Sequence, residues 1–350
     1  MRVFSIGSRI VTIDRPAFIV AEAGINHCGS RAKAIEMCKV AKAAGADAIK
    51  FQVFKAAEFC ADKTQTITYM TQGVRVTEPM LDMFQRHELE DDDWQLIANT
   101  CRALDLTFFA TPQNLPDLDL LMRIGVNVLK IGSDDFNNYP LISAYSQTGM
   151  PLILSCGMAD MADVHLALQA AGWFDGRMVA LLLCTSLYPT PPDEVRISRL
   201  VTLRNAFPGL VVGFSDHTQG PLASALASAL GARIFEKHFT LSHDLPGPDH
   251  WFSEDPGGLK TWIQTIRMAE TMSGDPQIKP AQEEMAMRAL ARRSVVAVAN
   301  IAAGDTLGPG NIGLRRPGTG LPPSMLKELQ GLRASRSIRA GSLLGYGDFE

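Results

Sequence analysis

The chain lacks the paired cysteines that hold small or secreted domains together. It contains 6 cysteines in 350 residues, and no two of them form a C-x-x-C pair. A chain of this length can bury a core large enough to fold without disulfides. We therefore expect the cysteines, at positions 28, 38, 60, 101, 156 and 184, to be reduced thiols.

Long apolar runs and an excess of one charge are also missing. No apolar run is long enough to span a bilayer, and the first residues, MRVFSIGSRIVTIDRP, lack the pattern of a secretory signal. We therefore expect a cytoplasmic protein that does not bind membranes. With 33 Lys and Arg against 37 Asp and Glu, mixed in sign throughout, the chain has no basic stripe, which argues against nucleic acid as a partner.

The chain instead contains eight short apolar runs that alternate with amphipathic stretches. The runs are apolar on both faces, as is typical of buried parallel strands, and helical stretches such as 30–44, 93–104, 160–171 and 219–230 lie between them. This order predicts an α/β fold, a (β/α)8 TIM barrel, with a long doubly wound sheet as the alternative. The runs are AFIVAEA, ADAIKFQV, LTFFATP, VNVLKIGS, PLILSCGM, MVALLLCTS, LVVGFSDHT and ARIFEKHFT.

Chemically capable side chains sit at the C-terminal ends of these runs. In a barrel these ends converge on one mouth, where barrel enzymes place their active sites, whereas an open sheet would spread them along an edge. Segment 55–92, longer than a usual β/α loop, is either a lid over this mouth or a surface excursion. The side chains are Glu22, Lys50, Thr111, Lys130, Ser133, Ser155, Tyr188, Ser215, His217, Glu236 and His238.

The composition changes near the C-terminus. We predict a catalytic barrel over 1–272, a linker with a short helix over 273–293, and a small β-rich domain over 294–350, where glycines and turn signals are frequent. A domain of about 60 residues is marginal in size and is helped by docking on something larger.

Two histidines in matched positions form the most informative pair. His217 in GFSDHT and His238 in FEKHFT follow successive strands. Adjacent strands lie about 4.8 Å apart, so both imidazoles could bind one divalent ion and leave positions open for water and substrate. A lone histidine after a strand is more often structural, but the matched pair favours a metal site.

Charged residues inside apolar runs supply the remaining candidates. Lys50 and Lys130 are costly to bury unless they meet an anion, which is either a ligand or a neighbouring carboxylate. Glu22 and Glu236 are acid-base candidates, because burial raises the pKa of a carboxyl group, although one of them could instead be an ion-pair partner of Lys50 or Lys237. The turn after Glu22, with Asn26 and His27, either lines the site or is a glycine-shaped turn.

A series of motifs runs along the barrel part of the chain. In order, they are AEAGINHCG, GADAIKFQ, LKIGSDD, SCGM, CTSLYPTPPDEV, GFSDHT, EKHFT and GPDHWFSE. In this order they resemble the N-acetylneuraminate (sialic acid) synthase family and its legionaminate, pseudaminate and spore-coat relatives. RRSVVAVANIAAGDTLGPGNIGLRRPGTGLPP resembles the family's antifreeze-like (SAF, β-clip) C-terminal domain.

The resemblance implies a transferase that condenses phosphoenolpyruvate with an open-chain 2-acetamido sugar of the N-acetylmannosamine type. It implies that His217 and His238 hold a divalent ion, manganese first, with magnesium or cobalt as alternatives. It also implies a domain-swapped homodimer, in which Arg316 reaches the sugar in the partner's barrel. Phosphoenolpyruvate would meet Lys50, Thr111, Lys130, Ser133, Ser155 and Ser215, the sugar would meet Asp135, Ser186, Tyr188 and Asp249, and Glu22 would lead acid-base catalysis with Glu236 beside it.

The chain departs from the sialate pattern at the sugar site. CTSLYP places Ser186 where the family commonly has asparagine, SCGM replaces STGM, and SDD replaces SGE. Loss of an amide changes which sugar substituents are accepted, so a 2,4-diacetamido-2,4,6-trideoxyhexose, giving legionaminate- or pseudaminate-type products, is the alternative substrate. A non-catalytic sugar-binding barrel and a Schiff-base aldolase using Lys50 or Lys130 are alternatives of other classes.

Overall fold

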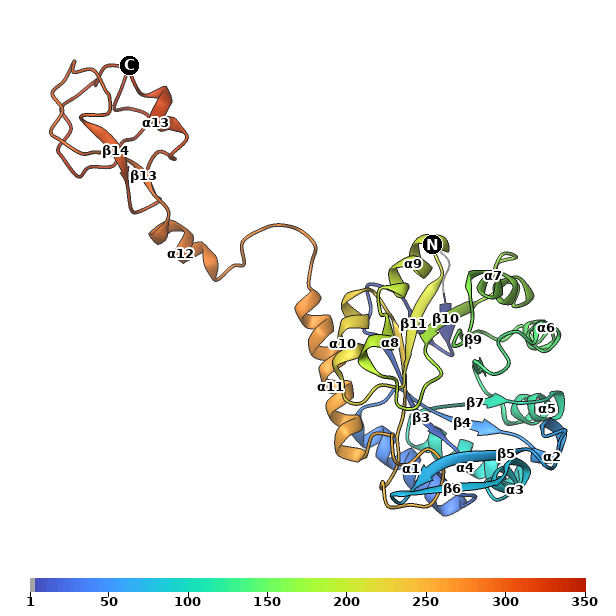
Figure 1. The fold of residues 1–350 in the computed structure, drawn as a ribbon. Coiled ribbons are helices and arrows are strands. Elements are labelled where there is room, and N and C mark those ends of the chain that lie inside the picture. Colours follow the sequence, from blue (N-terminus) through green and yellow to red (C-terminus); the bar gives the residue numbers. More distant parts are fainter. Residues whose placement is uncertain (1–3) are drawn as a thin grey trace. The chain divides into compact units, whose positions relative to one another are not determined.

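A computed structural model describes residues 4–350, and the chain divides into two compact units. The first unit ends at Gly274, and the second runs from Asp275 to Glu350. Figure 1 shows the order of the elements in both.

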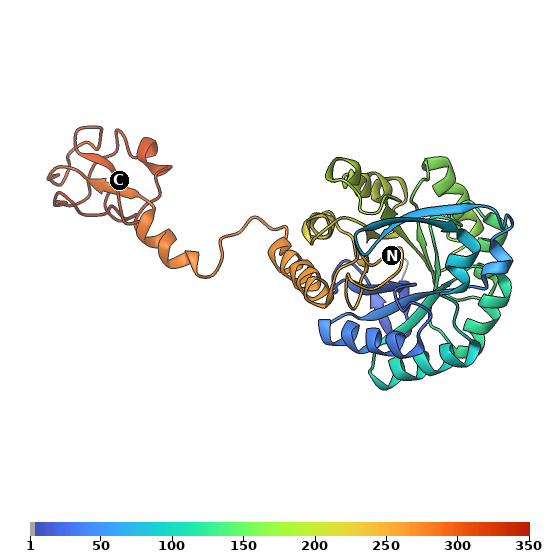
Figure 2. The same ribbon diagram turned by 60° about the horizontal axis from the view of Figure 1, so that its bottom comes forward.

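All eight apolar runs form parallel strands of one sheet. Their order is β7-β4-β3-β12-β11-β10-β9-β8, and the outer strands β7 and β8 lie next to each other, so the sheet is nearly closed. Helices surround the strands in Figure 2, which confirms the predicted barrel. The strands are β3 (Phe18–Gly24), β4 (Ala48–Val53), β7 (Thr107–Pro112), β8 (Leu129–Ile131), β9 (Leu152–Ser155), β10 (Val179–Cys184), β11 (Val211–Asp216) and β12 (Ile234–His238).

The helices between the strands begin and end at residues suited to those positions. Ser30 and Asp255 cap α1 and α11 by accepting a hydrogen bond from a backbone N–H of the first turn, and Gly45 ends α1 in the left-handed conformation. No helix within residues 4–350 is both long and apolar enough to cross a bilayer. The helices are α1 (Arg31–Ala44), α4 (Asp91–Ala103), α5 (Leu115–Ile124), α6 (Tyr139–Gln147), α7 (Met161–Ala170), α8 (Pro192–Val195), α9 (Arg199–Ala206), α10 (Leu222–Ala229) and α11 (Pro256–Ser273).

The inside of the barrel changes from apolar to polar along the strands. Near their N-terminal ends, Val20, Ala48, Phe109 and other inward residues pack with the hairpin of β1 (Phe4–Ile6) and β2 (Arg9–Val11). Because alternate residues of a strand face the same side, the residues two positions further along also point inward. These residues are Glu22, Lys50, Thr111, Lys130, Ser155, Cys184 and Glu236. The strand period therefore explains why lysines and glutamates interrupt apolar runs.

The long segment after β4 forms a hairpin with flanking helices. β5 (Thr66–Thr71) pairs antiparallel with β6 (Val74–Pro79), and the short helices α2 (Ala56–Phe59) and α3 (Met80–Gln85) lie on either side in sequence. Residues of the hairpin line the cavity at the barrel mouth, which supports the lid interpretation over a surface excursion.

The second unit has a small core of its own. It contains α12 (Glu284–Ala291), the antiparallel pair β13 (Ser294–Ala297) and β14 (Ile312–Arg315), and α13 (Met325–Glu328). Its core residues come from the whole of its β-rich part, and α12 has no buried residue. The core consists of Val295, Ala297, Ile301, Leu307, Ile312, Leu321, Leu329, Ala334, Ile338 and Leu344.

Candidate active site

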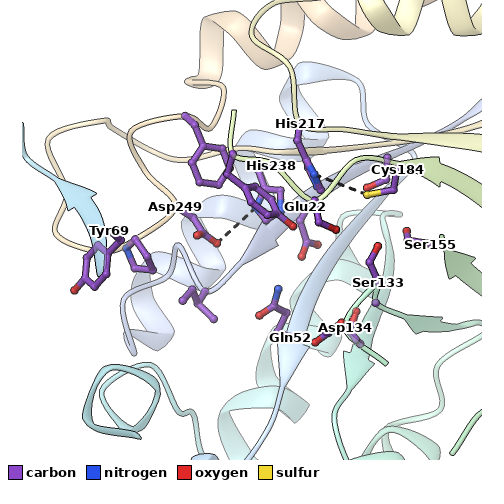
Figure 3. A pocket seen from close by; sticks show the side chains of 18 of the residues that line it. Glu22, Gln52, Tyr69, Ser133, Asp134, Ser155, Cys184, His217, His238 and Asp249 are labelled. Atoms are coloured by element: carbon purple, nitrogen blue, oxygen red, sulfur yellow. Dashed lines mark hydrogen bonds and ion pairs between the residues drawn. The ribbon is translucent and has the colours of Figure 1, made fainter. Parts of the chain in front are cut away.

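One cavity of about 600 Å³ opens at the C-terminal ends of the barrel strands. Figure 3 shows side chains from several strands converging on it. It is lined by every candidate residue of the barrel except Asp135. The lining candidates are Glu22, Lys50, Thr111, Lys130, Ser133, Ser155, Ser186, Tyr188, Ser215, His217, Glu236, His238 and Asp249.

Two lysines and two glutamates form a buried charged layer at the cavity floor. The Nζ atom of Lys50 lies 2.9 Å from Oε1 of Glu22 and 3.9 Å from Oε1 of Glu236, and it donates to Oγ1 of Thr111 at 3.0 Å. The Nζ atom of Lys130 lies 3.6 Å from the same Glu236 oxygen. Neither Glu22 Oε2 nor Glu236 Oε2 has a hydrogen-bond partner within the described chain. The lysines therefore pair with neighbouring carboxylates, one of the two expected interpretations, and both also face the cavity. Binding of an anionic ligand stays a prediction.

The two carboxyl groups have opposite pKa shifts. Burial raises the pKa of Glu22 from 4.5 to about 7, more than the nearby Lys50 can offset. Burial would also raise the pKa of Glu236, but Lys130 and Lys50 outweigh it and lower that pKa. Titratable groups whose pKa values are pushed apart are typical of acid-base pairs. The pKa of Glu22 is thus shifted toward neutral pH, while the carboxylate of Glu236 lies beside both lysines.

The pKa values of the two lysines are also shifted in opposite directions. Burial alone would lower the pKa of Lys50, but the carboxylates of Glu22 and Glu236 raise it above its ordinary value. For Lys130, burial prevails over Glu236 and lowers the pKa.

The imidazoles of His217 and His238 face each other across the cavity wall, with ring centroids 5.5 Å apart. His217 Nδ1 lies 2.8 Å from the carbonyl oxygen of Thr185, an acceptor, so this nitrogen carries the proton and Nε2 carries the lone pair. His238 Nδ1 is buried without a hydrogen-bond partner, 3.7 Å from Oδ2 of Asp249. A metal-binding histidine typically donates its other N–H to a carbonyl or carboxylate. His217 meets this pattern, and the unpartnered nitrogen of the buried His238 could meet a ligand, so the pair fits a divalent ion.

Within residues 4–350, no group of three or more His, Cys, Asp or Glu side chains is arranged to hold a metal. An ion bound by the two imidazoles alone would have fewer protein ligands than the three typical of catalytic zinc sites, and water or substrate would have to supply the rest.

Hydroxyl groups line the side of the cavity formed by β8, β9 and β10. Ser133 Oγ accepts a hydrogen bond from the backbone N–H of Gly157 at 3.0 Å, and the hydroxyls of Ser155 and Ser186 are buried without a partner. A Cβ atom at Gly157 would lie 2.4 Å from Ser186 Oγ and 2.6 Å from Ser133 Oγ. A side chain at position 157 would displace both hydroxyls from their places beside the cavity.

The residues expected to meet the sugar lie nearer the opening. Tyr188 is 45% exposed, and its ring centroid lies 4.2 Å from that of His217. Burial raises the pKa of Asp249 to about 6. Asp135 does not line the cavity; its Oδ1 accepts from Asn138 Nδ2 at 3.0 Å, and its neighbour Asp134 lines the cavity instead. Arg316 belongs to the second unit, and its role stays a prediction.

The turn after β3 lies behind the strands. Asn26 Nδ2 donates to the carbonyl of Phe239 at 2.8 Å, and the buried His27 ring packs near Phe51 and Trp94. Neither Asn26 nor His27 lines the cavity, so the turn interpretation holds.

Sequence reasoning missed several lining residues. Gln52 and Cys184 each lie two positions after an inward-facing residue of β4 or β10, so the strand period could have identified both. Tyr69 and Arg75 of the hairpin, and Trp251 of the loop before α11, also line the cavity. No local pattern identifies those three residues, because they lie outside the barrel strands and the fold of the long connecting segments places them at the cavity.

Comparison with known proteins agrees with this site. Residues 37–278 match the NeuB family, and residues 292–350 match the SAF domain. The chain belongs to the NeuB family. Over 331 residues it is 37% identical to the N,N'-diacetyllegionaminic acid synthase of Legionella pneumophila, covering 93% of each chain. It is 33% identical to the enzyme of the same name from Campylobacter jejuni, covering 94% of this chain and 99% of that one.

A solved structure gives the same result for this NeuB family member. The N-acetylneuraminic acid (sialic acid) synthetase of Leptospira borgpetersenii superposes with a TM-score of 0.73 at 30% identity, covering 82% of this chain and 95% of that one. Membership in the sialic and nonulosonic acid synthase family, the barrel and the SAF domain are therefore confirmed.

Proposed function

We propose that this protein is a nonulosonic acid synthase that condenses phosphoenolpyruvate with an open-chain acetamido sugar and releases phosphate. The observation that carries the proposal is the charged layer at the cavity floor, in which Lys50 and Lys130, both almost fully buried, face the cavity. Buried cations that face a cavity can bind a compact dianion such as a phosphate ester.

Phosphoenolpyruvate would occupy the floor. Lys50 and Lys130 would bind its carboxylate and phosphate, and the hydroxyls of Thr111, Ser133, Ser155 and Ser215 would supply hydrogen bonds. The unpartnered, buried hydroxyl of Ser155 supports this role, since buried polar atoms usually find a partner.

The reaction forms one carbon–carbon bond and breaks one carbon–oxygen bond. Carbon 3 of phosphoenolpyruvate attacks carbon 1 of the sugar aldehyde, whose oxygen takes up a proton, and water then adds at carbon 2. The tetrahedral intermediate expels inorganic phosphate and leaves the keto acid. Glu22 would accept the proton of the attacking water, because its pKa of about 7 suits proton transfer near neutral pH.

His217 and His238 would hold a divalent ion, with manganese as our first choice. When bound, such an ion polarises the aldehyde oxygen of the sugar. Tyr188, Asp249 and Asp134, which all line the cavity, would orient the sugar chain above the floor. Glu236 would keep the lysines charged and in place through its contacts with both.

For the sugar we propose a 2,4-diacetamido-2,4,6-trideoxyhexose, with N-acetylmannosamine as the second candidate. Ser186 supports the first choice, because its buried hydroxyl lies where a second cavity, of about 640 Å³, meets the first. The two cavities share Met158, Cys184 and Ser186. Similarity to two N,N'-diacetyllegionaminic acid synthases also supports it.

The test is phosphate release by the full-length protein with phosphoenolpyruvate and Mn²⁺. We expect release with a diacetamido hexose, slower release with N-acetylmannosamine, and none without sugar. No release with any sugar of either class, from folded protein, would refute the proposal.

A Schiff-base aldolase is the competing activity, since the lowered pKa of Lys130 would favour a nucleophilic amine. Borohydride reduction in the presence of pyruvate separates the two. Our proposal predicts no mass increase on Lys130, whereas an aldolase would be covalently trapped.

A further inference from the structure

A second buried charge cluster lies on the outer face of β11 and β12, away from the cavity. Asp216 and Lys237 are register partners on these strands and are 1% and 2% exposed. Lys237 Nζ lies 3.2 Å from Asp216 Oδ2 and 3.8 Å from Oε1 of Glu254, which lies in the loop between β12 and α11. None of these three residues lines the cavity. We call Asp216, Lys237 and Glu254 the outer cluster.

Neighbouring groups satisfy the carboxylates of the outer cluster. Asp216 Oδ1 accepts from the N–H and the hydroxyl of Thr218 at 2.9 and 2.7 Å, and Asp216 Oδ2 accepts from the Ser224 hydroxyl of α10 at 2.6 Å. Trp262 of α11 donates to the Ser224 oxygen at 2.8 Å, and the Gly220 N–H donates to Glu254 at 3.0 Å. The cluster thus connects two strands to the two helices that cover them.

The outer cluster brackets both histidines of the candidate metal site. Asp216 and Thr218 flank His217 in the chain, and Lys237 Nζ donates to the Thr218 carbonyl at 2.5 Å. Lys237 precedes His238, whose carbonyl accepts from the Glu254 N–H at 2.9 Å. The main chain around each imidazole is therefore held by groups of this one cluster.

Stability alone does not explain such a cluster. A buried ion pair is about as stable as apolar residues of the same volume, because desolvation offsets the attraction, whereas loss of one partner is strongly destabilising. The charges also contribute geometry, since Lys237 contacts Asp216 directly across the observed register of β11 and β12. The same register sets the separation of His217 and His238.

We propose that Asp216, Lys237 and Glu254 are positioning residues that hold the two imidazoles at the separation needed to bind a divalent ion. The inference rests on the proposed metal site and adds residues to it that touch neither ion nor substrate. Groups that orient metal ligands from behind typically change metal affinity about 10- to 100-fold when mutated.

The barrel provides a control at its opposite end. Asp47, which directly precedes β4, pairs with Arg9 and with Arg267, whose guanidinium lies 3.0 Å away, and accepts from the Ile19 N–H at 2.8 Å. Asp47→Asn therefore weakens a second, more exposed charge cluster far along the strands from the histidines.

The test is Mn²⁺ binding to the full-length protein, measured by isothermal titration calorimetry, with circular dichroism as the check of folding. Asp216→Asn and Lys237→Met should weaken Mn²⁺ binding about 10- to 100-fold, while Asp47→Asn should change it less than about twofold. Lys237→Arg, which keeps the charge, should recover part of the affinity. Folded Asp216→Asn protein with wild-type affinity would overturn the inference.

A milder variant covers the case in which a charge substitution prevents folding. Ser224→Ala removes the hydrogen bond to Asp216 and the acceptor of the Trp262 N–H, but it leaves all charges in place. We expect about fivefold weaker Mn²⁺ binding. Unchanged affinity in this variant would also overturn the inference. If the wild-type protein itself binds no Mn²⁺, the proposed metal site fails and the positioning role fails with it. Wild-type binding with unaffected variants rejects the positioning role alone.

Discussion

Replacing Glu22 by glutamine should make the folded barrel less sensitive to alkaline pH while removing activity. Glu22 is 1% exposed, and its second carboxylate oxygen has no partner in the described chain. A buried carboxyl group with a raised pKa binds its proton more tightly in the folded than in the unfolded chain. As pH rises from the pKa of this group in the unfolded chain to its pKa in the folded chain, the unfolded chain loses its proton first. The folded state therefore loses stability over this pH range.

The magnitude follows from the size of the shift. The pKa of Glu22 lies at about 7 instead of 4.5, and each pKa unit corresponds to about 1.4 kcal/mol. Below pH 4.5 both states are protonated and the effect vanishes, whereas above pH 7 it is complete at about 3 kcal/mol. Between pH 5 and 8, the free energy of unfolding of Glu22→Gln should therefore rise relative to wild type by about 2 to 3 kcal/mol.

The assay is urea unfolding of metal-free protein at several pH values, followed by tryptophan fluorescence. All 4 tryptophans of the chain lie in the barrel unit, so the signal reports this unit alone. Glu36→Gln, which removes a charge from the exposed face of α1, is the matched control and should track wild type at every pH. If the difference between Glu22→Gln and wild type stays constant within about 1 kcal/mol, the burial argument is wrong.

Three further predictions concern the same site. Either His217→Ala or His238→Ala should abolish measurable Mn²⁺ binding and most phosphate release, because two protein ligands are too few to lose one; full turnover after EDTA treatment would contradict this. Ser186→Asn should shift the kcat/KM ratio about tenfold toward N-acetylmannosamine, the scale of one polar contact, and an unchanged ratio in competition assays would remove Ser186 from specificity. Mixing Glu22→Gln with Arg316→Ala protein under subunit exchange should restore roughly a quarter of wild-type sites if the small domain crosses to the partner, whereas activity at single-mutant level, with exchange confirmed by mass spectrometry, would argue against crossing.

Much of the barrel could be predicted because buried parallel strands carry a strong local signal. The eight apolar runs contain the strands, and the polar residues at their ends converge because the topology sends every C-terminal end to one mouth. Lys50 and Lys130 could be identified from the sequence as well, because a lysine inside a buried apolar run is costly unless it meets an anion.

Features set by tertiary contacts could not be predicted in this way. Which of Asp134 and Asp135 faces the cavity depends on the conformation of the turn after β8. In that turn Asn138 donates a hydrogen bond to Asp135, and Asp134 lines the cavity. The different pKa shifts of Glu22 and Glu236 depend on which lysines each one faces. The outer cluster was hidden because Asp216 and Lys237 lie beside the histidines in sequence but on the opposite face of their strands.

The exposed stretch at the start of the second unit has a practical consequence. Residues 275–290 are exposed, and α12, which lies mostly within this range, has no buried residue, while each unit keeps a separate core. Exposed chain without buried side chains is where proteases cut first. Brief digestion should therefore release two fragments that remain folded, and adding the smaller fragment back to the larger one would show how much turnover depends on a covalent tether.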